Sequence, residues 1–104
     1  MRSIRVSRTY LAALHDLLAF GHTRFGRAVV DEKRKRISDV IRNVLAVYPT
    51  IGGFDESHGI HFHAVSGTPF VLLYDFDEAE LRIHLVIHRR ANRSSVDVAN
   101  IDWR

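Results

Sequence analysis

The side chains best able to do chemistry in this sequence are histidines, and five of the seven lie in its second half. His61 and His63 are two residues apart, and Arg82, His84 and His88 are also separated by even numbers of residues. Because side chains alternate between the two faces of a β-strand, we expect each set to point to one side of its strand. If the two strands belong to one sheet, the sets share a face. There, imidazoles that titrate near neutral pH could move protons in RNA cleavage, while the arginine stabilises the charge on the reacting phosphate.

The same pattern has two other interpretations. Polar residues that alternate along an antiparallel strand are also expected on an ordinary solvated face. Alternatively, His61 and His63 would lie about 7 Å apart along one strand face. This spacing occurs in metal sites that a third ligand completes, and Asp75, Glu78 or His84 could supply it. Nothing in the sequence fixes that third ligand, so we assign neither a metal nor a cofactor.

Two basic clusters could bind a partner. Residues 88–93, His-Arg-Arg-Ala-Asn-Arg, follow the last predicted strand, where a loop can face another molecule. Guanidinium groups suit phosphates and carboxylates. Residues 33–36, Lys-Arg-Lys-Arg, cover the outer turns of a predicted amphipathic helix. Both clusters can equally be solubilising charge, and for residues 33–36 we favour that interpretation.

Composition excludes several classes of protein. The chain has 104 residues, 46% of them hydrophobic, and no cysteine, so disulfides and thiolate chemistry are excluded. We expect one domain over residues 1–104, with residues 94–104 as a C-terminal tail, in the cytoplasm and without a membrane-spanning segment. Residues 1–49 carry ten Lys and Arg against four Asp and Glu, which favours an acidic partner or nucleic acid. Phosphate-binding loops, His-Glu-x-x-His and nucleophile elbows are absent from the sequence.

Hydrophobic periodicity predicts the elements that position these side chains. Ser7 or Thr9 can cap the first helix, Gly21 and Gly26 bracket a break, and Pro49 stops the second helix. The predicted segments are a strand at 2–6, helices from residue 10 and over 27–47, strands at 60–65, 70–76 and 81–87, and an acidic turn at 75–80. The sequence therefore predicts an α+β fold, a helical hairpin packed on a small, mainly antiparallel sheet in the order β-α-α-β-β-β.

Two segments of the second half stand on either side of the acidic turn: Pro69-Phe70-Val71-Leu72-Leu73-Tyr74 and Leu81-Arg82-Ile83-His84-Leu85-Val86-Ile87-His88-Arg89-Arg90. Together they resemble the RelE/ParE toxins of bacterial type II toxin–antitoxin systems. That family commonly shows an apolar strand ending in Tyr, an acidic turn, and a strand finishing in a hydrophobic-His-x-Arg-Arg-like sequence. Ser7, Ala12 to Leu18, and Pro49-Thr50-Ile51-Gly52 agree in order, so the resemblance covers roughly residues 3–93.

The resemblance implies a growth-inhibiting toxin, of the kind associated with plasmid stabilisation, that a cognate antitoxin neutralises in a hetero-oligomer. The disordered C-terminal segment of the antitoxin would fold onto the toxin, its acidic residues drawn by the basic surface. The antitoxin contacts that we expect are Tyr10, Leu14, Leu18 and Arg82, beside the corner at residues 88–90.

Two activities divide this family. ParE-like members poison DNA gyrase, whereas RelE-like members cut mRNA on the ribosome with basic and tyrosine side chains. This sequence has Lys33 and Lys35 as its only lysines, and Trp103 stands near the chain end where RelE-like nucleases have Tyr. The resemblance therefore favours the ParE-like branch.

For a ParE-like toxin we expect DNA gyrase as the target and no catalysis. The target-binding residues would then be His88, Arg89, Arg90 and Arg93. The alternative is a ribosome-dependent mRNA endoribonuclease, whose catalytic residues would be His61, His63, Arg82, His84 and His88. A third interpretation is a non-toxic module that binds metal or nucleic acid.

Overall fold

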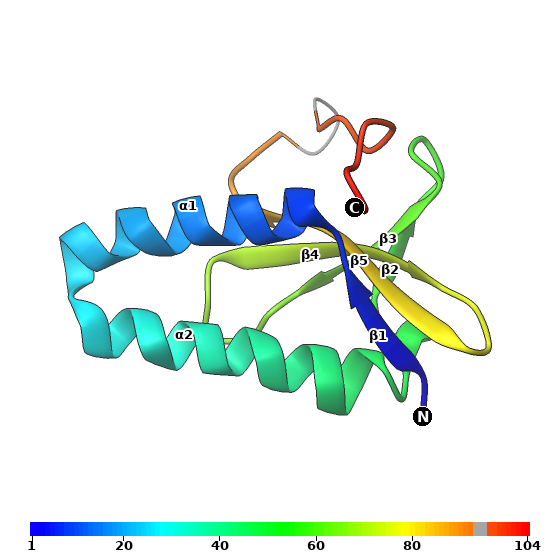
Figure 1. The fold of residues 1–104 in the computed structure, drawn as a ribbon, viewed down its shortest axis with the longest axis horizontal. Helices are drawn as coiled ribbons and strands as arrows, with labels where there is room; N and C mark the ends of the chain where they lie inside the picture. Colours follow the sequence, from blue (N-terminus) through cyan, green and yellow to red (C-terminus); the bar gives the residue numbers. More distant parts are fainter. Residues whose placement is uncertain (93–95) are drawn as a thin grey trace.

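Two helices cover one face of a five-stranded sheet in the computed structural model, which describes residues 1–92 and 96–104 (Figure 1). The elements in chain order are β1 (Ser3–Val6), α1 (Arg8–Phe25), α2 (Arg27–Val40), the π-helical turn η1 (Ile41–Leu45), the 3-10 turn η2 (Pro49–Ile51), β2 (Gly53–Asp55), β3 (Ile60–Ala64), β4 (Phe70–Phe76) and β5 (Glu80–His88). The predicted α+β architecture of a helical hairpin on a mainly antiparallel sheet is confirmed. No helix of the described part is long and apolar enough to cross a membrane.

The strands lie in the order β1-β5-β4-β3-β2. β1 pairs in parallel with β5, and the three other pairings are antiparallel. β2 is absent from the sequence-based prediction because it contains only Gly53-Phe54-Asp55, which is too short to show an alternating pattern. The acidic turn is also shorter than predicted, since β4 includes Asp75 and ends at Phe76.

The first helix begins at one of the two predicted caps. The Ser7 hydroxyl accepts a hydrogen bond from the Tyr10 backbone N–H at 2.8 Å and donates one to the carbonyl of His84 at 2.6 Å. Gly26, with a φ of 86°, separates α1 from α2. The predicted break at Gly21 is wrong, because α1 runs through that glycine to Phe25 and packs it against Val30 of α2.

The second helix changes its winding before it ends. α2 stops at Val40 and continues as η1, in which the N–H of Ala46 bonds to the carbonyl of Ile41. This five-residue spacing defines a π-helical turn. The prediction of one helix over 27–47 therefore places a helical segment correctly but misses its change of type.

The core lies between the helices and one sheet face, which we call the inner face. Its helical side consists of Tyr10, Leu18, Val30, Ile37, Ile41 and Leu45, and its sheet side of Phe70, Leu72, Tyr74, Leu81, Ile83 and Val86. Tyr74 is fully buried, and its hydroxyl donates a 2.6 Å hydrogen bond to the carbonyl of Pro49. This bond ties the turn after α2 to the middle of the sheet.

A β-bulge at His84 divides β5 into two halves. Leu73 of β4 pairs with Leu85, but the next residue, Tyr74, pairs with Ile83, so His84 is the extra residue. An extra residue shifts the alternation of side chains by one position. Ile83 and Val86 consequently both lie on the inner face, although they are three residues apart.

Candidate functional site

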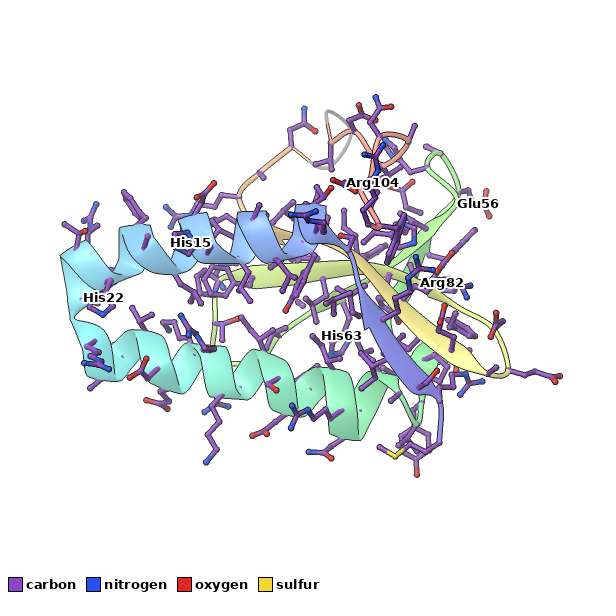
Figure 2. All side chains as sticks on the ribbon, in the orientation of Figure 1. His15, His22, Glu56, His63, Arg82 and Arg104 are labelled. Carbon is purple, nitrogen blue, oxygen red and sulfur yellow. The ribbon has the colours of Figure 1, made fainter. Side chains whose placement is uncertain are left out.

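The predicted site residues lie on opposite faces of the sheet. Residues paired across neighbouring strands share a face. His61, His63 and His88 pair with Tyr74, Leu72 and Phe70, all of which belong to the inner face. Arg82 instead pairs with Asp75 on the outer face. Figure 2 shows His63 between the sheet and α2, and Arg82 beside β5, away from α2.

The expectation that all five residues share one face is therefore wrong. The bulge at His84 is the reason, because it places Arg82 and His84 on the outer face while His88 returns to the inner one. A general acid and base must both reach one reacting group, and this arrangement separates the imidazoles that would do so. Asp75 and His84 lie on the outer face and therefore cannot complete a metal site with His61 and His63 on the inner face. Within residues 1–92 and 96–104, no three His, Asp or Glu side chains converge as a metal site would require.

The inner histidines of β3 have different surroundings. The His61 ring lies between aromatic neighbours, with centroid distances of 4.8 Å to Phe54, 5.5 Å to Tyr74 and 4.9 Å to Phe76. Burial lowers the pKa of His63 below its ordinary value, because an apolar environment disfavours the charged imidazole. Both environments suit side chains that contribute to packing.

Arg82 stands at the centre of an acidic cluster on the outer face. Its guanidinium donates to Asp75 at 2.7 Å, to Asp77 at 2.9 Å and to Glu80 at 3.2 Å. The Arg82 guanidinium is the main reason that the pKa of Asp77 falls to about 2. The positive charge of Arg82 is thus already compensated, which makes it a poor ligand for a phosphate or an incoming carboxylate.

The C-terminal residues dock beside this cluster. Trp103 packs edge-on against His84 at 4.8 Å, and the Arg5 guanidinium lies 5.1 Å from the Trp103 ring centroid. Two hydrogen bonds hold the segment to the start of α1: Arg8 N–H donates to the Asp102 carbonyl, and Asp102 N–H donates to the Thr9 hydroxyl. Of the predicted tail, residues 94 and 95 lie outside the described residues, and residues 96–104 contain no strand and form a docked segment.

The basic corner at the end of β5 is held by hydrogen bonds from two backbone N–H groups. The Arg89 N–H donates to the Pro69 carbonyl at 2.7 Å, and the Arg90 N–H bonds to the His88 ring nitrogen Nδ1 at 3.1 Å. The side chains of Arg89 and Arg90 are exposed. Arg93, the fourth predicted target-binding residue, lies outside the described residues.

His88 also lines an apolar cavity of about 90 Å³ between the helical hairpin and the β4–β5 end of the sheet. Its other walls include Leu17, Phe20, Phe25, Val29, Lys33 and Phe70. Phe20 and Phe25 are 64% and 60% exposed, and the Arg24 guanidinium lies within 6 Å of both ring centroids. These phenylalanines are not among the predicted site residues. The sequence does contain a signal for Phe20, which is an aromatic residue outside the buried stripe of its helix.

A second hollow lies between α1, α2 and the edge strand β1. This groove has a volume of about 360 Å³ and is lined by Ile4, Val6, Tyr10, Leu11, Leu14, Arg34, Ile37, Ser38, Ile41 and Arg42. Of the predicted antitoxin contacts, Leu14 and Tyr10 line it, although Tyr10 is buried. Leu18 is also buried in the core, and Arg82 lies on the outer face. The four predicted residues therefore do not form one continuous surface.

Of the comparisons with known proteins, the one with solved structures finds a similar chain. The sequence matches no protein-family model and no curated protein. Among solved structures, a chain of the "Chromosomal ParDE TA system from P. aeruginosa" is similar, with a TM-score of 0.72 at 17% sequence identity. The match covers 85% of this chain and 96% of the other. At this identity the likeness establishes a shared fold.

Proposed function

We propose that this protein is the toxin of a bacterial type II toxin–antitoxin system, that it belongs to the ParE-like branch of the RelE/ParE family, and that it inhibits DNA gyrase. The observation that carries the proposal is the shared fold with a ParDE chain over 85% of this chain. The ordered sequence resemblance over residues 3–93 points to the same family. Because fold alone does not determine function, the site must supply the rest of the argument.

The groove between α1, α2 and β1 supports an antitoxin as partner. Leu11, which is 51% exposed, and Ile4 present apolar surface along the groove, and Arg34 and Arg42 supply positive charge within it. An amphipathic helix binds such a groove with apolar residues spaced three and four apart, while its acidic residues face the arginines. We therefore assign antitoxin binding to this groove, which replaces the predicted Leu18 and Arg82 with Leu11, Arg34 and Arg42.

The separation of the imidazoles supports a binding toxin in preference to a nuclease. Arg82 is compensated by three carboxylates, and His61 and His88 lie near different ends of the sheet. For a toxin that acts by binding its target, the basic corner at residues 88–90 is the surface for gyrase.

Three measurements test the proposal. Expression of the chain alone should arrest bacterial growth, and purified protein should inhibit DNA supercoiling by gyrase at micromolar concentrations. A translating extract with added protein should show no new mRNA cuts. Folded protein that neither arrests growth nor inhibits supercoiling would overturn the proposal. Codon-specific cuts that disappear in His88→Ala would replace it with the nuclease function.

A further inference from the structure

The tip of the helical hairpin and the basic corner form one continuous surface around the 90 Å³ cavity. α1 contributes Phe20, α2 contributes Val29 and Lys33, and the end of β5 contributes His88. Pro69 also lines the cavity and accepts the hydrogen bond from the Arg89 N–H, which places the backbone of Arg89 next to a wall of the cavity. We call Phe20, Phe25, Val29, Lys33, His88 and Arg89 the tip surface.

The tip surface has an apolar centre and a basic rim. Phe20, Phe25 and Val29 are each at least 40% exposed. Arg24 lies over both phenylalanine rings, and the cavity has Lys33 at its wall. The nearest acidic residues along α2 are already paired, Asp31 with Arg27 at 3.7 Å and Glu32 with Arg36 at 3.6 Å. Aromatic anchors beside a pocket and surrounded by charge are the usual arrangement of a protein-binding hot spot.

From this surface we infer a second binding site, distinct from the α1–α2–β1 groove, for an acidic protein surface that inserts one aliphatic side chain into the cavity. The occupant's carboxylates would face Arg24, Lys33 and Arg89. A nucleic acid duplex fits less well, because its phosphate backbone would satisfy the basic rim and leave the apolar cavity and both phenylalanines exposed to water. The inference deepens the proposed function, on which it rests for the identity of the partner: the tip surface is the face that contacts gyrase.

A peptide titration tests the surface independently of the target. The probe is a capped peptide of sequence Glu-Glu-Leu-Glu-Glu, followed through the backbone amide signals of the 15N-labelled full chain. Millimolar peptide should shift the amides around the cavity, among them Phe25, Val29 and His88. The matched peptide Lys-Lys-Leu-Lys-Lys should leave them unchanged. No shifts at millimolar acidic peptide, or shifts confined to other regions, would overturn the inference. Stronger shifts at these amides with a DNA duplex would overturn it in favour of nucleic acid.

Paired variants connect the surface to the target. Phe20→Ala combined with Phe25→Ala removes both anchors, and Tyr48→Ala combined with Phe54→Ala removes two comparably exposed rings elsewhere. All four side chains are more than half exposed, so both variants should fold, which circular dichroism verifies. The tip variant should need at least about tenfold more protein to inhibit supercoiling, whereas the control should match the wild type.

The outcomes separate the two proposals. If the wild type inhibits gyrase and the tip variant inhibits equally well, the tip surface is not the target face and the inference fails alone. If the wild type does not inhibit gyrase, the proposed target is wrong, and the peptide titration decides the existence of the surface. Inhibition lost in the tip variant and kept in the control supports both.

Discussion

The hydroxyl of Ser7 connects the start of α1 to the bulge in β5, and its removal is the sharpest test of the structure. Ser7 is fully buried. It accepts the hydrogen bond of the Tyr10 N–H, which caps α1, and donates a 2.6 Å bond to the carbonyl of His84 in the β-bulge. The Ser7→Ala change removes both interactions without adding volume. We therefore expect it to destabilise the start of α1 and the bulge together.

The expected loss can be estimated from the two bonds. Replacing a serine N-cap by alanine costs about 1 kcal/mol. Leaving the part-buried His84 carbonyl without this donor adds a further cost of about 1–2 kcal/mol. The free energy of unfolding should therefore fall by about 2–3 kcal/mol. For a chain of 104 residues this corresponds to a decrease in Tm of about 10–20 °C.

Urea unfolding followed by circular dichroism measures this difference, and Ser3→Ala is the matched control. Ser3 makes a side-chain bond to the Ala79 carbonyl but is exposed, so its replacement should change the free energy of unfolding by less than about 0.5 kcal/mol. If Ser7→Ala is no more destabilising than Ser3→Ala, the cap and its bond to the bulge do not contribute as the structure indicates.

Three further changes have defined outcomes. Tyr74→Phe removes a buried donor and should lower the free energy of unfolding by about 1–2 kcal/mol in urea, so an unchanged value would count against that bond. Because Arg82 lowers the pKa of Asp77 to about 2, this carboxylate stabilises the fold above pH 4 and loses that effect as the pH falls towards 2. Arg82→Gln should raise the pKa of Asp77 towards its ordinary value, measured by NMR titration, and a pKa that stays near 2 would refute the assignment. Thr9→Val removes an acceptor for the C-terminal segment and should shift the emission of Trp103, the single tryptophan, to longer wavelength, whereas an unchanged spectrum would show that this bond does not hold the segment.

Much of the fold follows from local patterns in the sequence. The continuous apolar run of β4, the alternating run of β5, the apolar stripe of α1 and the cap at Ser7 are signals that neighbouring residues carry by themselves. The prediction at Gly21 failed because glycine weakens a helix only modestly, and packing against Val30 outweighs that cost. β2 was missed because three residues carry no periodicity, and they become a strand only beside β3.

The candidate site was harder to predict than the fold. Alternation alone places Arg82, His84 and His88 on one face, and a single unpaired residue is enough to separate them. The bulge depends on how β4 and β5 align across the hairpin, which is a property of two strands and not of either sequence. Similarly, Phe20 and His88 are far apart in sequence, and only the packing of the helical hairpin on the sheet brings them to one cavity.

Because β1 pairs in parallel with β5, the fold cannot be completed until β5 has been synthesised. Ser3 lies beside Glu80, and the Ser7 hydroxyl needs the carbonyl of His84. Contacts between residues so distant in sequence cannot form until the later segment has left the ribosome. A nascent chain that ends before β5 therefore has an unpaired first strand, a helix whose capping serine lacks its second partner, and an unfinished core. The tip surface also includes His88, so this surface cannot form before β5 has left the ribosome.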